Sequence, residues 1–333
     1  MKNEMTGIVV TVARDRRSLA QPFVIARGSI TDVEFVTVRI SSGGHVGRGE
    51  CCPVPHFGES VEGVVELAER YGRLLSEGAE WDDLHDQCPA GAARNAIDCA
   101  HWDWRAKSEG QPAWELLGLP RPAPTVTAFT IGIDTPERMA ERARPAAAKH
   151  PLPKTNLGAR ADMDRIRAVR PAAPIATLIA DANEGWTAEE LDQALPVLAE
   201  CGFEMLEQPF KAGQDRLLEG VARLVSIAAD ESCHVAADVA RIAPFYDMVN
   251  IKLDKTGGLT EASRLLDTAH AAGLETMVGC MLGTSLAMAP ALLLAARCRY
   301  ADLDAPLLMG SDCESHLIYD RGVVGPPLAA LWG

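Results

Sequence analysis

Two kinds of hydrophobic spacing divide the chain. Residues 8–13 and 33–40 are rich in β-branched side chains with partial alternation, which predicts half-buried antiparallel strands. The Ser-Ser-Gly-Gly run at residues 41–44 is typical of a turn between strands. From Ser60 the spacing becomes helical, with Ser60 as a suitable N-cap, and a second helix is predicted over residues 90–107. Strands followed by helices indicate an α+β domain.

Beyond Pro124, short apolar runs alternate with amphipathic helical segments. Strands that alternate with helices at this spacing imply a parallel sheet. The number of units favours a (β/α) barrel, but the pattern alone does not separate a barrel from a doubly wound sheet. The proline-rich run at residues 120–124 is the expected linker. The predicted strands are 126–133, 178–181, 205–207, 227–230, 248–252 and 276–280, and the predicted helices are 136–149, 188–201, 216–224, 235–242, 259–272 and 287–296.

Composition narrows the class of protein. With 47% hydrophobic and 23% charged residues, the 333-residue chain has the make-up of a globular protein. Its 46 acidic and 32 basic residues give a formal net charge of −14. Nucleic acids and anionic membranes are bound by basic surfaces, so neither is an expected partner. An acidic chain does suit a site that collects metal cations.

Cysteine usage and the apolar segments bear on location. The nine cysteines include no Cys-x-x-Cys pair, which argues against a disulfide framework or a zinc ribbon and favours a reducing cytoplasm. Residues 1–5 lack the apolar core of a signal peptide. Residues 277–296 carry no charge and are long enough to span a bilayer. Their glycines, hydroxyl residues and proline favour instead a buried strand, a loop and a buried helix.

Three acids stand where predicted strands stop. Asp181, Glu207 and Asp230 each follow a short apolar run and lie about one βα unit apart. The carboxyl ends of adjacent barrel strands meet at one mouth, where active sites of such barrels lie. Three close carboxylates repel one another unless a cation lies between them, and hard oxygen ligands favour Mg²⁺. The alternative is that the acids are solvated helix N-caps, although Glu is a poor N-cap.

Three further charged residues lie at later strand ends. Lys252 ends the next predicted strand, and a lysine whose charged form is disfavoured can act as a base near neutral pH. The alternative is a surface lysine paired with Asp254. Asp302 and Asp304 follow the expected eighth strand and could hold a substrate ammonium group by charge-assisted hydrogen bonds. The alternative for this pair is a solvated turn.

Several short motifs occur together, in a fixed order, over nearly the whole chain. They are PFVIARGS (22–29), GRGEC (47–51), PAGAARNA (89–96), DAN (181–183), EQP (207–209), DES (230–232), NIKLDKTGGL (250–259), GCMLGTS (279–285) and DLD (302–304). In this order the set resembles the enolase superfamily, within its muconate-lactonising-enzyme-like branch. The closest likeness is to dipeptide epimerases of the L-Ala-D/L-Glu epimerase type.

The resemblance implies an architecture. The fold expected is α/β, an α+β capping domain plus a modified (β/α)7β TIM-like barrel. The capping domain is expected over residues 1–120, completed by residues 312–333, and the barrel with its site over residues 121–311. Barrels of this branch are often homo-oligomers, so a homo-oligomer is a possible state by analogy.

The resemblance also implies a chemistry, epimerisation of a dipeptide with Mg²⁺ as the cofactor. Asp181, Glu207 and Asp230 would bind the ion, which holds the substrate carboxylate. Lys252 would be one of two bases that face each other across the α-carbon. Removing an α-proton beside a carboxylate builds an enediolate, and a divalent cation stabilises that developing charge. A base is needed on each face, because the proton leaves one side and returns on the other.

The same likeness suggests the residues that touch the dipeptide. The acids at positions 302 and 304 would hold its free amino group. Met281 and Thr284, from the GCMLGTS segment, are expected to lie beside the substrate.

One departure from the family pattern concerns the second base. The family has a Lys-x-Lys motif at the end of the second barrel strand, whereas this chain has Lys154-Thr155-Asn156. Lys154 matches the first lysine, an electrostatic helper, and Asn156 matches the lysine that moves the proton. An amide has no proton to exchange near neutral pH. Three outcomes stay open: Lys154 substitutes, only the Lys252 half-reaction remains, or the protein performs a one-base reaction.

A second departure concerns specificity. In epimerases that act on acidic dipeptides, a basic residue follows the Gly-Ser of the capping loop and pairs with the Glu side chain. Here Ile30 follows that Gly-Ser, which predicts a neutral or apolar second residue in the dipeptide. Arg27, His56 or Lys2 could still supply the charge.

Two rival functions remain. One is another reaction of the branch, such as muconate cycloisomerisation or o-succinylbenzoate synthesis. Asp302 and Asp304 argue against it, because those substrates carry no ammonium group. The other is a catalytically silent protein that binds the metal and a dipeptide, with Asn156 as the reason for its silence.

Overall fold

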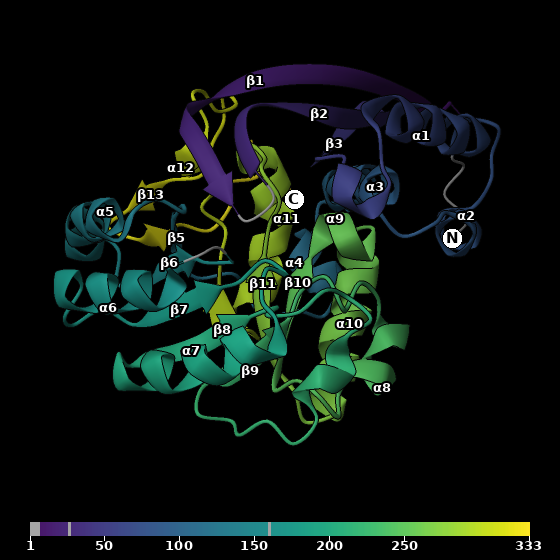
Figure 1. Ribbon diagram of the computed structural model, residues 1–333. Coiled ribbons are helices and arrows are strands. Elements are labelled where there is room, and N and C mark those ends of the chain that lie inside the picture. Colours follow the sequence, from purple (N-terminus) through teal and green to yellow (C-terminus); the bar gives the residue numbers. More distant parts are fainter. Residues whose placement is uncertain (1–6, 26–27, 159–160) are drawn as a thin grey trace.

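The computed structural model describes residues 7–25, 28–158 and 161–333 (Figure 1). The N-terminal part forms an antiparallel sheet in the order β1-β2-β3, with helices packed against one of its faces. The helix-rich α+β capping domain predicted from the sequence is therefore confirmed. Its elements are β1 (Val9–Ile25), β2 (Gly28–Ser42), β3 (His45–Cys51), α1 (Val61–Ser76), α2 (Trp81–Gln87), α3 (Ala92–Glu109) and α4 (Ala113–Leu116).

The cap is held together by a close contact between α3 and β3. A Cβ atom on Gly47 would lie 2.1 Å from the carbonyl oxygen of Ala100, and one on Gly49 would lie 2.1 Å from that of Ala96. Only glycine lets the strand approach the helix backbone this closely. On the other side, Ser60 accepts a hydrogen bond from the backbone of Gly63, so it caps α1 as the sequence predicts.

Eight parallel strands follow in sequential order, from β5 to β12. The backbone N–H of Ala128 donates to the carbonyl oxygen of Ala301 at 2.7 Å, which joins the first strand to the last. The sheet is therefore a closed barrel and not a doubly wound sheet. The strands are β5 (Phe129–Ile131), β6 (Pro153–Asn156), β7 (Leu178–Asp181), β8 (Phe203–Glu207), β9 (Ser226–Ala229), β10 (Met248–Lys252), β11 (Glu275–Gly279) and β12 (Tyr300–Ala301).

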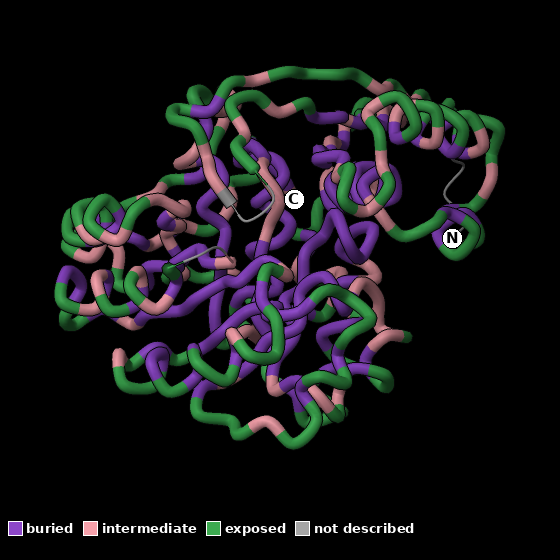
Figure 2. Tube along the Cα trace, viewed as in Figure 1, coloured by how far each residue is buried: buried purple, intermediate pink, exposed green. Residues whose placement is uncertain are grey.

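Helices and loops surround this barrel, and the buried residues concentrate between the two layers (Figure 2). Below the mouth, each strand or the residue before it sends one apolar side chain to the barrel axis, and together these fill the interior. The outer helices are α5 (Pro136–Lys149), α6 (Asp162–Ala172), α7 (Ala188–Glu200), α8 (Val239–Ile242), α9 (Leu253–Thr256), α10 (Leu259–Ala271), α11 (Ser285–Ala295) and α12 (Ala305–Leu308).

Two helices predicted from the sequence differ from the elements in the structure. The helix expected at 216–224 is only a 3-10 turn at Asp215–Leu218, because the backbone is already extended at Glu219 (ψ 123°) and left-handed at Gly220 (φ 76°). The helix expected at 235–242 is divided into a 3-10 turn at Ala236–Asp238 and the short α8. The predicted strand at 126–133 is likewise divided between β4 (Thr125–Val126) and β5.

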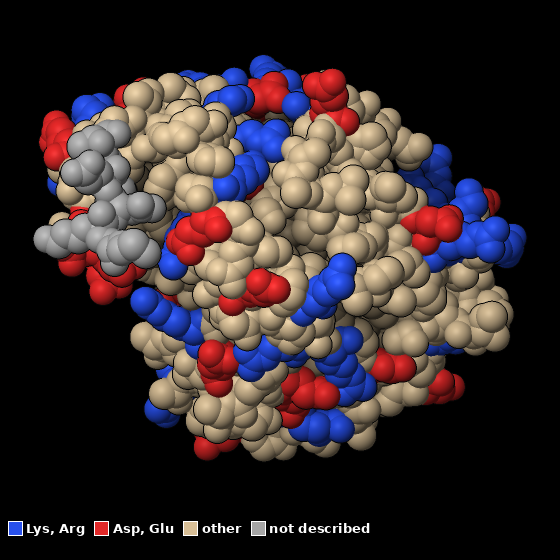
Figure 3. All heavy atoms as spheres, turned by 180° about the vertical axis from the view of Figure 1, so that it is seen from behind, with Lys and Arg blue, Asp and Glu red and all other residues tan. Residues whose placement is uncertain are grey.

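The uncharged segment 277–296 forms most of β11, a loop and the buried α11, as predicted. Among the residues the structure describes, no helix has the length and apolar character needed to cross a membrane. Acidic and basic side chains are interspersed on the face shown in Figure 3.

Two contacts illustrate how the cap is joined to the rest of the described chain. Figure 1 shows the β1–β2 hairpin extending over the top of the barrel, and the N–H of Ile133 donates to the carbonyl oxygen of Val24 at 3.0 Å. After β13 (Tyr319–Asp320) and β14 (Val323–Val324), Trp332 donates to the carbonyl oxygen of Cys99 in α3 at 3.1 Å. The division of the chain at residues 120 and 311 stays a prediction.

Candidate active site

The three acids predicted from the strand ends lie side by side. Asp181 and Glu207 are the last residues of β7 and β8 and are register partners, and Asp230 follows β9 directly. They are 3%, 0% and 1% exposed. The helix α7 is capped by Thr187, not by Asp181. The alternative that these acids are solvated N-caps is therefore wrong.

Lys154, from β6, lies among carboxylates. Its Nζ is 2.9 Å from Oδ2 of Asp181, 2.7 Å from Oε2 of Glu207 and 2.8 Å from Oδ2 of Asp302. Burial alone would lower the pKa of Lys154, but these acids outweigh it and hold the pKa well above its usual value. Lys154 is therefore an ammonium group held by three carboxylates.

Two more lysines hold Asp230. The Nζ of Lys252 is 2.5 Å from Oδ2 of Asp230, and the Nζ of the fully buried Lys255 is 2.7 Å from Oδ1. Lys255 also donates to the carbonyl oxygens of Cys233 and Asn250, both at 2.9 Å. Burial would raise the pKa of Asp230, but the two ammonium groups hold it well below its usual range. Its carboxylate is thus charged and fixed in orientation.

Lys252 is not a surface lysine. It is buried, and its nearest acid is Asp230, whereas Asp254 accepts hydrogen bonds from Asn95 and from the backbone of Cys52. Burial lowers the pKa of Lys252, but the charges of Asp230 and Glu207 raise it by more than burial lowers it. The pKa of Lys252 therefore lies above its usual value. The alternative of a Lys252–Asp254 surface pair is wrong.

Glu207 carries negative charge that its neighbours do not fully compensate. Burial, followed by repulsion from Asp181, raises the pKa of Glu207 to about 7. Its Oε1 accepts a hydrogen bond from the side-chain amide of Asn250 at 2.5 Å and lies 4.0 Å from Nζ of Lys252. A further positive charge beside it would stabilise the ionised form.

The charges of the whole cluster point the same way. Five strand-end carboxylates face three buried ammonium groups, which leaves a formal charge of −2 when all are ionised, and the buried Glu231, which also acts on Lys252, adds to the negative charge. The carboxylates are those of Asp181, Glu207, Asp230, Asp302 and Asp304, and the ammonium groups are those of Lys154, Lys252 and Lys255. Uncompensated buried charge is costly. The residues present therefore fit one divalent cation with oxygen ligands.

Asp302 and Asp304 are buried, at 5% and 3% exposed, so the solvated-turn alternative is wrong. Oδ2 of Asp304 accepts from the backbone N–H of Thr130 at 2.7 Å. Burial, and then the nearby Asp302, raise the pKa of Asp304 to about 7. A cation placed beside this pair would favour the charged form of both acids.

Part of this cluster lines a cavity of about 110 Å³, whereas Glu207, Asp230 and Lys255 lie outside its lining. The sequence-predicted residues that line it are Lys154, Asn156, Asp181, Lys252, Met281, Asp302 and Asp304. Residues that sequence reasoning missed are Phe23, Thr130, Asn183, Cys280, Leu282, Ala305 and Leu308. Asn183, Cys280 and Leu282 lie in loops, and the other four lie in β1, β5 and α12; most of the seven are apolar or small, and no spacing rule marks them.

Two predicted substrate contacts lie outside this lining. Thr284 is buried and donates through its N–H and its Oγ1 to the carboxylate of Glu50, at 2.7 and 2.9 Å. Thr284 is the N-cap of α11, and its hydroxyl forms a hydrogen bond that joins the barrel to Glu50 of the cap. Ile30 is half-buried against an apolar cluster that includes Leu19 and Phe35. The alternative charge donors Lys2 and Arg27 lie outside the described residues.

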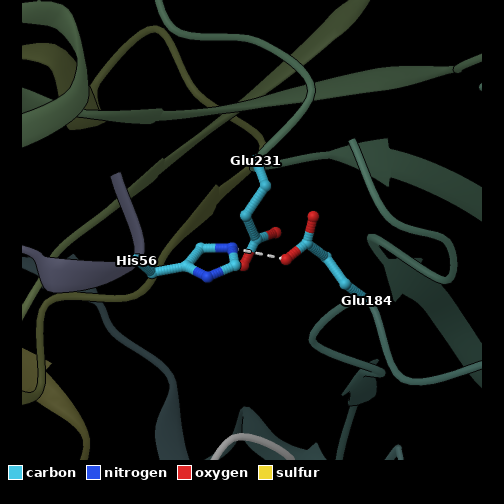
Figure 4. A group of neighbouring side chains, drawn as sticks. All are labelled: His56, Glu184 and Glu231. Carbon is cyan, nitrogen blue, oxygen red and sulfur yellow. Dashed lines mark ion pairs between the residues drawn. The ribbon is translucent and has the colours of Figure 1, made fainter. Parts of the chain in front are cut away.

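A second group beside the mouth went unpredicted (Figure 4). His56 comes from the cap, and Glu184 and Glu231 come from the turns that follow Asp181 and Asp230. Nε2 of His56 lies 2.6 Å from Oε2 of Glu184, and one potential ligand atom of each residue lies within 4.8 Å of the others. The group connects the cap to the barrel rim. The signal in the sequence was that its two acids, Glu184 and Glu231, come shortly after strand ends.

A capped parallel barrel with carboxylates and lysines at its strand ends defines the enolase type of barrel protein. The chain belongs to the mandelate racemase / muconate lactonizing enzyme family: it matches the family's N-terminal domain over residues 7–118 and the enolase C-terminal domain-like family over residues 138–324. The resemblance seen in the sequence is thereby confirmed.

Individual relatives are also similar over nearly their full length. The chain is 43% identical to the L-Ala-D/L-Glu epimerase of Escherichia coli (strain K12), over 94% of this chain and 98% of that protein. It is 39% identical to the N-acetyl-D-glutamate racemase of Pseudoalteromonas sp, over 90% and 95%.

Solved structures agree with the fold. An enolase family member from Agrobacterium tumefaciens, with homology to dipeptide epimerases and with sodium and L-Ala-L-Glu bound, has a TM-score of 0.95 at 44% identity, covering 98% of this chain and 100% of that one. The dipeptide epimerase of Enterococcus faecalis V583, complexed with Mg and L-Leu-L-Tyr, has a TM-score of 0.88 at 29% identity, covering 96% and 97%.

Proposed function

We propose that this protein is a Mg²⁺-dependent dipeptide epimerase. The observation that carries the proposal is the buried cluster of Asp181, Glu207 and Asp230 beside Lys252, in a chain 43% identical to an L-Ala-D/L-Glu epimerase. The dipeptides and Mg in the solved structures of relatives support the same substrate class and cofactor.

The three strand-end acids would hold the Mg²⁺, with Lys255 fixing the orientation of Asp230. When bound, the ion supplies positive charge where the substrate carboxylate gains negative charge. Lys252 would remove the α-proton, or return it, from its own side of the cavity. The negative charges of Asp230 and Glu207 raise the pKa of Lys252. Mg²⁺ bound to these two acids would compensate their charge, which favours the neutral, basic form of Lys252.

The other ends of the dipeptide have matching groups. Asp302 and Asp304 would bind the free ammonium group. Lys154 lies between Asp302 and two proposed metal ligands, so bound substrate and metal would displace it from these contacts. It could then hold the substrate carboxylate.

Asn156 makes the proposed reaction one-sided. β6 and β10 lie four strands apart in the eight-stranded barrel, so Asn156 and Lys252 approach the cavity from opposite sides. Of these two side chains, only Lys252 can carry a proton near neutral pH. We expect exchange of the α-proton of one epimer with solvent, and slow interconversion of epimers. The same feature supports the second candidate, a protein that binds metal and dipeptide without catalysis.

Proton NMR in D₂O with Mg²⁺ tests this function. We expect the α-proton of one epimer of a dipeptide to be replaced by deuterium, and no replacement after chelation of the metal. Rapid deuteration of both epimers would contradict the one-sided mechanism. Isothermal titration separates the candidates, because tight Mg²⁺-dependent dipeptide binding without any exchange would support the silent protein.

The residue after the capping-loop Gly-Ser concerns specificity. Ile30 packs in the same apolar cluster as Phe23, Met281 and Leu308, which line the cavity. This supports a neutral or apolar second residue in the dipeptide. Exchange rates over a panel of Ala-Xaa dipeptides provide the test, and a strong preference for Ala-Glu would contradict it. Ile30→Arg should shift the preference toward Ala-Glu.

Muconate cycloisomerisation and o-succinylbenzoate synthesis are less well supported, because the buried pair Asp302 and Asp304 would have no ammonium group to bind. A cytoplasmic location and a homo-oligomeric state stay predictions.

A further inference from the structure

A second hollow lies next to the catalytic cavity. It is a partly open groove of about 390 Å³ between the tip of β1, the strand β5 and the helices α5 and α12. Its lining is mainly apolar and includes Phe129, whose ring stacks on that of His150 with centroids 4.3 Å apart, together with Ile131 and Leu307. None of these side chains has a role in the proposed proton transfer.

The groove borders the catalytic cavity. Phe23, Thr130 and Leu308 line both hollows. The backbone of Thr130 also donates to Asp304, one of the two acids proposed to bind the substrate ammonium group. A substrate held at these acids therefore has the groove next to its N-terminal residue.

The volumes of the two hollows support this placement. Pockets that bury a small ligand usually measure about 300–1,000 Å³. The catalytic cavity, at about 110 Å³, is below that range, whereas the groove alone, at about 390 Å³, is within it. The catalytic cavity therefore suits the reacting part of a dipeptide and leaves the rest to be placed elsewhere.

The charge at the rim does not favour an acidic occupant. Arg142 lies on the groove, but its guanidinium is 2.9 Å from Oδ2 of Asp134, which compensates its charge. Lys149, the other cation in the lining, is exposed to solvent. The rest of the lining is mainly aromatic and aliphatic, with Gln21, Thr130 and His150 as its polar members.

We infer that this groove is the subsite for the side chain of the dipeptide's N-terminal residue, and that it selects a large apolar or aromatic side chain there. The inference rests on the proposed function, because the ammonium group must be held at Asp302 and Asp304 for the side chain to reach the groove. It deepens that function by naming the N-terminal residue class.

Isothermal titration in the presence of Mg²⁺ tests the subsite with Ala-Leu, Phe-Leu and Glu-Leu. Burial of an aromatic side chain contributes enough to make Phe-Leu about 10- to 100-fold tighter than Ala-Leu. Ala20→Trp, at an exposed lining position of β1, should remove most of this difference and leave Ala-Leu binding nearly unchanged. Ala13→Trp is the matched control, since Ala13 is exposed on the same strand and does not line the groove.

The outcomes separate this inference from the function on which it rests. Equal binding of Ala-Leu and Phe-Leu, or tighter binding of Glu-Leu than of Phe-Leu, would overturn the subsite alone. Persistence of the Phe-Leu advantage in Ala20→Trp, and in the second blocking variant Gln21→Trp, would also overturn it. Failure of every dipeptide to bind with Mg²⁺ would overturn the proposed function and the subsite together.

Discussion

The two sides of the catalytic cavity differ in chemistry but not in placement. Lys252 and Asn156 each end a strand of the same barrel, are 7% and 2% exposed, and line the same cavity. On the Lys252 side, Asp230 and Lys255 form a buried network of charges. On the other side, the position is an amide that cannot transfer a proton near neutral pH. The barrel thus places both side chains at the same cavity, and in the proposed mechanism the side chain at position 156 determines whether the second face can react.

Loss of Lys252 should have the largest effect on this comparison. In Lys252→Gln both faces carry an amide, so α-proton exchange should fall toward the upper end of the ~10²–10⁴-fold typical of a lost general base. NMR in D₂O measures the exchange, and Mg²⁺ titration checks that the cation site remains. Exchange at a rate near that of the unaltered protein would show that another group is the base.

Restoring the second base should have the opposite effect. Asn156→Lys places an ammonium group at the position that the structure fills with an amide, in a cluster with surplus negative charge. We expect epimer interconversion to rise by about 10²-fold or more, measured by polarimetry or chiral chromatography. Asn156→Gln, which keeps an amide, is the control and should not raise the rate. An unchanged rate in Asn156→Lys would show that more than one residue was lost on this side.

The Lys252 side also depends on Lys255. Lys255→Met removes one of two ammonium groups from the buried Asp230 and should lower the free energy of unfolding by about 3–5 kcal/mol. Urea denaturation measures it. The control Lys149→Met changes an exposed lysine and should stay within about 0.5 kcal/mol. A similarly small change in Lys255→Met would mean that Lys252 alone compensates Asp230.

A buried acid without a lysine partner sharpens the contrast. Burial raises the pKa of Glu50 to about 7 from 4.5, although Thr284 donates two hydrogen bonds to it. The folded state therefore keeps the proton to higher pH than the unfolded state. Stability contributed by this group is complete below about pH 4.5 and is lost as the pH rises through 7.

Glu50→Gln removes this titration and can keep both contacts to Thr284. The variant should be more stable than the unaltered protein at pH 8, by up to roughly 3 kcal/mol, with a flatter dependence between pH 4.5 and 7. Thermal unfolding at several pH values measures the difference. Parallel stability curves for the two proteins would contradict the raised pKa.

The features that the sequence predicted best are those with a geometric rule behind them. Acids after apolar runs had to meet at one mouth, because the ends of parallel strands do so, and Asp181, Glu207 and Asp230 are indeed adjacent. Capping of α1 by Ser60 followed from a hydrogen bond local in sequence. In contrast, β6 carries no apolar pattern and was recognised only through its motif.

Contacts between distant segments were not predictable in the same way. Thr284 was expected beside the substrate, yet it bonds to Glu50, more than two hundred residues away. His56 meets Glu184 only because the cap folds over the barrel. The groove beside the cavity combines β1, β5, α5 and α12, and no spacing within one segment reveals it.

The His56–Glu184 ion pair connects the cap to the turn that follows Asp181, one of the proposed metal ligands. Any outward swing of residues 55–57 must part His56 from Glu184, which stands three positions after Asp181. Departure of a product past the cap would thus pull on the turn that carries a proposed metal ligand. An opening of the cap at residues 55–57 and the position of a proposed metal ligand would therefore be coupled through the contact between His56 and Glu184.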